Sequence, residues 1–95
     1  MHVITRKRID EFIALHPESR SPLSAWFAIV EKTQFKSFAG LRMTFAKADL
    51  VGDKVVFNIG GNRYRLIAAV HFNRGKLFIR DILTHAEYDR GGWKK

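Results

Sequence analysis

Hydrophobic residues recur at helical spacing in two segments near the start of the chain. The apolar stripes consist of Ile9, Phe12, Ile13 and His16 in the first segment and of Leu23, Trp26, Phe27 and Val30 in the second. This spacing predicts amphipathic helices over 6–15 and 22–32. We expect Thr5 to cap the first helix and Ser21 to cap the second. Pro17 separates them, because a proline disfavours helical geometry in the residue before it, and the pair predicts a helical hairpin.

In the last third of the chain, hydrophobic and polar residues alternate with a period of two. The alternation over 64–72 is typical of a strand with one buried face. Residues 55–59 and 77–83 are rich in strand-forming side chains, and glycine-containing turns at 60–62 and 73–75 separate the three segments. These patterns predict an antiparallel β-meander.

The other segments carry weaker signals. The elements predicted there are a short strand at 2–4, a helical turn near 37–41, a loop over 48–53, a short helix after Thr84, and a tail at 91–95 that is mobile unless Trp93 docks. The whole pattern predicts one domain, residues 1–95, with an α+β fold. In it, two N-terminal helices pack on a small antiparallel β-meander sheet.

The charge of the chain narrows the class of partner. Its 95 residues include 17 Lys and Arg against 9 Asp and Glu, which gives a net charge of +8. This excess favours a polyanionic partner, meaning nucleic acid, an acidic protein or an anionic membrane surface. The absence of cysteine excludes a disulfide scaffold, a zinc finger and a thiol nucleophile. No apolar run reaches the roughly 18 residues of a membrane span and no cleavable leader is visible, so we expect a cytoplasmic protein.

Arg63 and Arg65 fall on the strand face that points away from the predicted core, and their partners depend on one turn. With a three-residue loop at 73–75, Arg65 faces Leu83 on the next strand. Arg63 then faces His85, and all four side chains share one face at one end of the sheet. A four-residue loop would move His85 to the other side.

Two guanidiniums and an imidazole at one sheet end, with Tyr88 one helical turn after His85, would suit phosphodiester chemistry. Arginine forks bind phosphate oxygens and stabilise transition-state charge. Histidine moves a proton near neutral pH, and tyrosine stacks on a base or donates a proton. In RNA the 2′-OH can itself be the nucleophile, so this chemistry needs neither a metal nor a cofactor.

Three other basic residues have both a structural and a functional interpretation. Arg80 shares strand parity with Phe78 and Ile82, so it is either paired structurally or bound to phosphate. Lys47 and Lys54 flank a loop that could reach a phosphate, although solvation also explains each of them alone.

A basic cluster marks the start of the first predicted helix. Arg6, Lys7 and Arg8 fall in its first turn, where cations oppose the helix dipole at a cost of about 0.3–1 kcal/mol each. They form either a solvated face or a surface that meets an acidic partner or RNA phosphates.

Four segments of the meander and its C-terminal extension carry a family resemblance. They read Val-Phe-Asn-Ile-Gly-Gly-Asn at 56–62, Arg-Leu at 65–66, Phe-Ile-Arg-Asp at 78–81 and Thr-His-Ala-Glu-Tyr-Asp at 84–89. Together with the opening Met-His-Val-Ile-Thr, they closely resemble the HigB toxins of bacterial type II toxin–antitoxin pairs. The resemblance covers nearly the whole chain and implies the RelE-like superfold.

The resemblance also implies an activity and partners. Members of this superfamily are typically mRNA interferases that cut mRNA in the ribosomal A site, where the 2′-OH attacks the adjacent phosphate and leaves a cyclic phosphate. A HigA-type antitoxin with a helix-turn-helix DNA-binding domain would silence the toxin, and the complex would repress its own operon.

Functional positions carry over residue by residue. The matching positions are Lys54, Arg65, Arg80, His85, Tyr88 and Asp89, and the expected RNA contacts are Lys47, Lys54, Arg63 and Asp89. By this resemblance, Arg65 and Arg80 stabilise charge at the scissile phosphate. His85 and Tyr88 take the acid/base and stacking positions, and Asp89 orients one of them. Which group is the acid and which is the base stays open.

Two other functions stay open on the sequence alone. One is a non-enzymatic toxin of the same superfold that inhibits a target such as DNA gyrase by binding. The other is a ribosome- or RNA-binding module that cuts nothing. The set of Arg65, Arg80, His85 and Tyr88 favours the nuclease, because a purely binding relative need not keep it.

Overall fold

The computed structural model describes residues 1–94, whose strands form one mixed sheet in the order β1-β5-β4-β3-β2. The strands are β1 (His2–Ile4), β2 (Asp49–Val51), β3 (Lys54–Ile59), β4 (Tyr64–His71) and β5 (Lys76–Thr84). Strands β3, β4 and β5 form the predicted antiparallel meander. At one edge β1 pairs in parallel with β5, and at the other β2 pairs antiparallel with β3.

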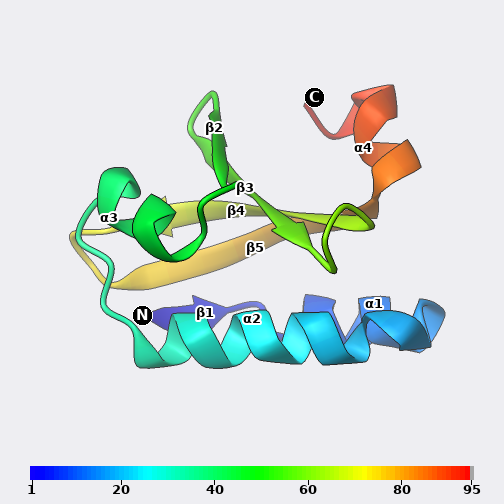
Figure 1. Cartoon of the computed structure of the whole chain (residues 1–95), viewed down its shortest axis with the longest axis horizontal. Coiled ribbons are helices and arrows are strands. Elements are labelled where there is room, and N and C mark those ends of the chain that lie inside the picture. The colour runs from blue at the N-terminus through cyan, green and yellow to red at the C-terminus, as the bar shows by residue number, and fades with distance from the viewer. Residues whose placement is uncertain (95) are drawn as a thin grey trace.

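Two helices cover one face of this sheet. The helices are α1 (Lys7–Leu15), α2 (Arg20–Lys32), α3 (Phe38–Thr44) and α4 (His85–Arg90), and the 3-10 turns are η1 (Pro17–Ser19) and η2 (Gly92–Lys94). Figure 1 shows α1 and α2 along one side of the sheet, with α3 and α4 at opposite ends of the other side. The predicted α+β fold, with its N-terminal helical hairpin, is therefore confirmed. No helix within residues 1–94 is long and apolar enough to cross a bilayer.

The core lies between the helical hairpin and the sheet. Its fully buried side chains include Leu23, Val30, Leu41, Phe57, Leu66, Leu77 and Ile79. The predicted stripes supply most of the helical contribution, because Ile9, Phe12 and Ile13 of α1 are buried. On α2, Trp26 packs edge-on against Phe57 of β3 at 5.3 Å between ring centroids. The alternation that predicted β4 therefore also identified its buried face.

The loop predicted over 48–53 is wrong at its centre, where β2 forms. This edge strand has only one partner, β3, and Leu50 in its middle is 52% exposed. A strand of three residues with one neighbour and no buried side chain carries no periodic signal. The backbone pairing alone defines it.

The predicted helix caps are also wrong. The residue that caps α1 is Arg6, without a side-chain hydrogen bond. Thr5 instead adopts φ 68°, and its hydroxyl accepts from the backbone N–H of Ile79 at 2.9 Å. Thr5 therefore fastens the β1–α1 corner to β5 rather than starting the helix.

The second helix begins earlier than its serine suggests. Pro17 opens a 3-10 turn, and α2 follows at once from Arg20, so Ser21 lies inside the helix. Ser19 occupies the cap position, but its hydroxyl donates to the carbonyl of His16 at 2.6 Å. The helical turn predicted near 37–41 does form as α3, and Ser37 caps it by accepting from the N–H of Gly40 at 3.1 Å.

A bulge in β5 decides which side chains meet at the end of the sheet. The β4–β5 connection has four residues, because His71 rather than Phe72 pairs with Lys76. The register then shifts, so that Ala68 faces Ile79 while its neighbour Ile67 faces Asp81. Arg80 is the extra residue of this bulge.

The bulge restores the pairing that a shorter loop would have produced. Arg65 stands opposite Leu83, as predicted for a three-residue loop. The backbone N–H of His85 donates to the carbonyl of Arg63 at 2.9 Å. The four-residue connection therefore does not move the start of α4 out of register, although a loop of that length was expected to do so, because one extra residue in the turn offsets one extra residue in the strand.

Candidate active site at the end of the sheet

Arg65 lies on β4, on the face away from α1 and α2, and only 9% of its surface is exposed. Its Nη2 donates to Oδ1 of Asn62 at 2.6 Å, and its Nη1 donates to the carbonyls of Asn62 and Tyr64 at 3.3 and 3.1 Å. The β3–β4 turn therefore holds the guanidinium in one orientation. The Cζ atom lies 5.5 Å from the ring centroid of Tyr88, in the range of a cation–π contact.

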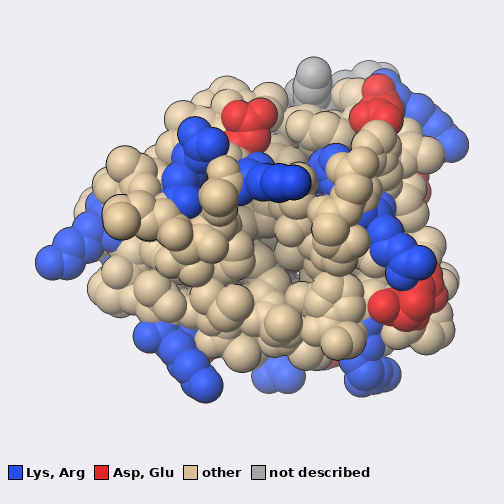
Figure 2. Space-filling model, viewed as in Figure 1, with Lys and Arg blue, Asp and Glu red and all other residues tan. Residues whose placement is uncertain are grey.

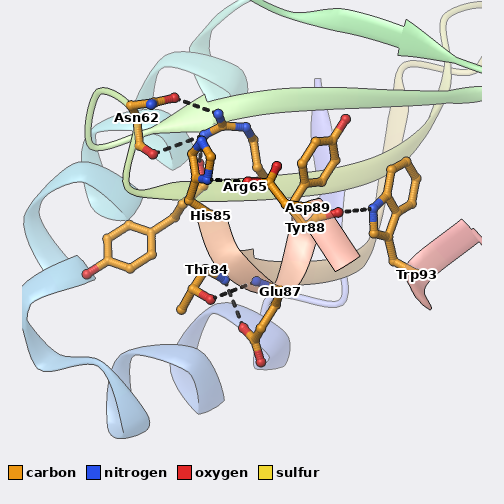
Figure 3. A network of polar contacts seen from close by, with 9 residues as sticks. Asn62, Arg65, Thr84, His85, Glu87, Tyr88, Asp89 and Trp93 are labelled. Carbon is orange, nitrogen blue, oxygen red and sulfur yellow. Dashed lines mark hydrogen bonds and ion pairs between the residues drawn. The ribbon is translucent and has the colours of Figure 1, made fainter. Parts of the chain in front are cut away.

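Helix α4 carries two more of the predicted catalytic side chains, His85 and Tyr88. Its first residue, His85, pairs through Nδ1 with Oδ2 of Asp89 at 2.8 Å, one helical turn later. Tyr88 lies on the side of the helix that faces Arg65. Figure 3 shows this short helix continuing directly from β5, so its side chains stand at the same sheet end as Arg65.

A capping box starts α4. The hydroxyl of Thr84 accepts from the N–H of Glu87 at 3.2 Å, and a carboxylate oxygen of Glu87 accepts from the N–H of Thr84 at 2.9 Å. That second bond is the main reason why the pKa of Glu87 is lowered from its ordinary value. Gly91 ends the helix at φ 76°, where a glycine is favoured. A helix of only six residues depends on such caps because it has little packing of its own.

We expect Thr84→Ala to destabilise the protein by about 1 kcal/mol, because it removes one half of the capping box. The pKa of Glu87 is lower in the folded protein than in the unfolded chain. The stability that its carboxylate contributes is therefore fully present above the unfolded-state pKa and is lost as the pH falls through the folded-state pKa. The backbone N–H of residue 84 remains in the variant, so both proteins should lose this contribution in acid while the difference between them changes little. Urea unfolding at neutral and acid pH measures both effects. Thr44→Ala, at the last residue of α3, is the matched control; an equal loss there would contradict the assignment.

The C-terminal tail docks on α4 through Trp93. The rings of Tyr88 and Trp93 stack at 5.0 Å with an angle of 15° between their planes. The indole Nε1 donates to the carbonyl of Tyr88 at 3.1 Å. Tyr88 thus lies between a guanidinium and an indole. The tail was predicted to be mobile unless Trp93 docks, and Trp93 does dock. Position 95 of the tail lies outside the described residues.

A groove of about 410 Å³ lies beside this stack, between the β2–β3 turn and the bulge of β5. The polar residues that line it are Lys54, Arg80, Asp81 and Asp53, and the side chain of Trp93 lines it as well. Lys54 Nζ lies 2.6 Å from Oδ1 of Asp53. The hydrogen bond and the charge of Lys54 lower the pKa of Asp53, and Arg80 adds to the effect. Figure 2 shows basic side chains between β2 and α4 on this side of the molecule, with acidic neighbours close by.

The bulge overturns the predicted surroundings of Arg80. Strand parity placed Arg80 on one face with Phe78 and Ile82, but the extra residue turns Ile82 into the core, where it is 7% exposed. Arg80 stays exposed and lines the groove next to Asp81. Arg80 therefore does not lie between two apolar side chains on one face of the strand, and its guanidinium is accessible to a phosphate.

Three of the four expected RNA contacts lie outside this groove, and one of them, Asp89, pairs with His85 on α4. Lys47 is exposed after α3 and borders a separate hollow with Asn58 and Gly61. Arg63 is exposed in the β3–β4 turn, where its backbone carbonyl binds the start of α4. The structure therefore groups Lys54 with Arg80, and Arg65 with Tyr88, with Trp93 as the link between the two groups.

The basic cluster at α1 divides into two surfaces. The guanidinium of Arg6 covers the ring of Phe27 at 4.6 Å, and Lys7 reaches Glu11 at 4.0 Å on an exposed helix face. Arg8 instead lines a second hollow on the sheet, which also reaches Arg80. The structure therefore places Arg6 against α2 and Arg8 over the sheet, with Lys7 on the exposed face of α1.

Sequence reasoning did not select Trp93 as a site residue. The only signal was an aromatic side chain in a glycine-rich, basic tail, and such a tail does not by itself dock. The contact becomes evident only after the capping box and Gly91 have set the direction of the chain after α4.

Comparison with known proteins agrees with this architecture. Residues 19–91 match the family described as HigB_toxin, the RelE-like toxic component of a toxin–antitoxin system. The fold is thus that of the RelE-like toxins. Within that class the chain belongs to the HigB toxin family, as its sequence segments predicted.

Curated relatives match over nearly their whole length. The chain is 35% identical over 92 residues to the mRNA interferase toxin HigB of Escherichia coli strain K12, which covers 94% of this chain and 88% of that protein. An mRNA interferase HigB of Shigella flexneri is equally similar. One from Escherichia coli O6:H1 is 28% identical over 93 residues, 95% of this chain and 90% of that protein.

Proposed function

We propose that this mRNA interferase cleaves translated mRNA in the ribosomal A site by using the 2′-OH of the RNA as the nucleophile. The observation that carries the proposal is the joining of His85–Asp89 and Arg65–Tyr88 at one sheet end by a single capped helix. The first pair supplies a proton-transfer group with an orienting carboxylate. The second supplies a fixed cation beside a tyrosine whose hydroxyl can donate a proton.

The proposed reaction balances within the RNA. The bond from the 2′-oxygen to phosphorus forms, and the bond from phosphorus to the 5′-oxygen of the next nucleotide breaks. The products are a 2′,3′-cyclic phosphate and a 5′-OH. His85 transfers one of the two protons involved, Asp89 holds its imidazole, and Arg65 and Arg80 stabilise the negative charge of the phosphorane.

Mapping of transcript ends tests the proposal. After induced expression, or with purified protein on programmed ribosomes, we expect new 5′-OH ends within translated messages and cyclic phosphates upstream of them. Intact mRNA in the presence of folded protein would contradict it. Growth arrest without cuts would point to an inhibitor that acts by binding, and a DNA supercoiling assay would then test gyrase.

We also propose that the antitoxin of this toxin is HigA-type, with a helix-turn-helix domain, and that the complex binds operator DNA. An acidic segment of such an antitoxin fits the start of α1, where Arg6 and Lys7 are neighbours in the chain. Lys7 has a side chain that is 85% exposed. Arg6 is held in place over Phe27 at the rim of a hollow between α1 and α2.

Reversing both charges with Arg6→Glu and Lys7→Glu should weaken antitoxin binding by about tenfold, mainly through a slower association rate that depends less on salt. Surface plasmon resonance at two salt concentrations measures this change. The control reverses two exposed cations elsewhere, Lys36→Glu and Lys76→Glu. If both double variants bind alike, the antitoxin does not use this surface.

A further inference from the structure

Trp93 forms one wall of the groove that holds Arg80 and Lys54. Two contacts hold the indole in place. Its ring stacks on Tyr88, and its Nε1 donates a hydrogen bond to the Tyr88 carbonyl. The indole is therefore held on the groove by a capped helix, although it lies in a chain terminus. A rigid aromatic wall loses little conformational entropy when a ligand stacks on it.

The same groove also provides positive charge for the phosphate of a nucleotide. Arg80 is exposed there, at the bulge of β5. Lys54 is partly neutralised by its ion pair with Asp53, which leaves Arg80 as the main cation for an incoming phosphate. A flat ring and a guanidinium that line one groove match a nucleobase and its own phosphate. The volume of about 410 Å³ is ample for one nucleotide.

The groove also lies next to the proposed reaction centre. The contacts run from Arg65 to Tyr88 at 5.5 Å and from Tyr88 to Trp93 at 5.0 Å, as Figure 3 shows for these side chains. A phosphate near Arg65 would therefore leave the adjoining nucleotide within reach of the groove.

We propose that Trp93 is an RNA-binding residue that stacks on a nucleobase adjoining the scissile bond, while Arg80 holds the phosphate of that nucleotide. This inference rests on the proposed function and adds a base-binding subsite to it. The position of Trp93 after α4 makes the tail part of the substrate site. Stacking without base-edge contacts accepts any base, so Trp93 should strengthen RNA binding with little sequence preference.

Trp93 itself reports on the interaction. The chain has two tryptophans, and the other, Trp26, is only 3% exposed in the core. A short single-stranded RNA should quench the fluorescence of the wild-type protein, whereas the same RNA made abasic should bind through its phosphates without quenching. In Trp93→Phe, the RNA should bind with nearly wild-type affinity, and the emission of Trp26 should not change.

The affinities follow from the anisotropy of the labelled RNA. Trp93→Ala should bind the intact RNA about tenfold more weakly and the abasic RNA as well as wild type does. Met43→Ala, which removes a side chain that is 89% exposed and does not line the groove, is the matched control and should change neither. A purely structural role for Trp93 would weaken both RNAs equally and would overturn the inference, as would saturating RNA binding without quenching.

The outcome separates this inference from the proposed nuclease activity. Quenching by intact RNA in a protein that cuts no mRNA on ribosomes would support the subsite and contradict the nuclease. Cleavage by Trp93→Ala at the wild-type rate and half-saturation, with no quenching in wild type, would contradict the subsite and leave the nuclease standing.

Discussion

His85→Gln should lower the rate of mRNA cleavage on ribosomes by about 10² to 10⁴, the range that removal of a positioned proton-transfer group typically costs. The substitution leaves the fold almost unchanged, because His85 is anchored through its backbone N–H to Arg63 and its side chain is only half-buried. Single-turnover cleavage at saturating ribosome concentration measures the chemical step. An unchanged melting temperature shows that the variant is folded.

Asp89 provides a graded test of the same pair. Asp89→Asn keeps the size of the side chain but removes the charge that lies 2.8 Å from the imidazole, so cleavage should fall on the order of tenfold through poorer positioning. In the His85→Gln background the second substitution should have little further effect, because the two residues act as one unit. If His85→Gln cleaved mRNA at the wild-type rate, another group would have to transfer the proton. Tyr88, which contacts Arg65, would be the next candidate.

The sequence predicted most of the fold because its elements bury one face each. The stripe of Ile9, Phe12 and Ile13 and the alternation along β4 both identified the surfaces that meet in the core. The caps failed for the opposite reason. Thr5 is needed more as a tertiary link to Ile79 than as a local cap, and local preference does not record such competition.

The candidate site residues were chosen by residue type and family resemblance, whereas their relative positions depend on a strand register that the sequence left open. Arg65 pairs with Leu83, as a three-residue loop would give, although the loop has four residues, because the bulge at Arg80 offsets the extra turn residue. No sequence pattern marks that bulge. It is also the feature that turns Arg80 outward, so the exposure of a proposed substrate-binding arginine is set by a backbone irregularity.

Arg65→Ala should have two effects of different origin. The guanidinium makes three hydrogen bonds to the β3–β4 turn, so its loss should destabilise the protein by about 1–3 kcal/mol. Its charge faces the proposed phosphate position next to Tyr88, so cleavage should also fall by about 10² to 10³. Thermal unfolding measures the first effect, and single-turnover cleavage well below the melting temperature measures the second.

Two further variants separate these effects. Asn62→Ala removes the acceptor at 2.6 Å and keeps the guanidinium, so it should reduce stability with a small change in cleavage. Arg65→Lys keeps the charge but loses the planar fork that reaches Asn62 and a phosphate at once, so its cleavage rate should lie between those of wild type and alanine. If Arg65→Ala lowered the melting temperature while the folded variant cleaved at the wild-type rate, Arg65 would be a structural residue of the turn. Arg80, exposed at the bulge, would then be the cation that stabilises the phosphorane.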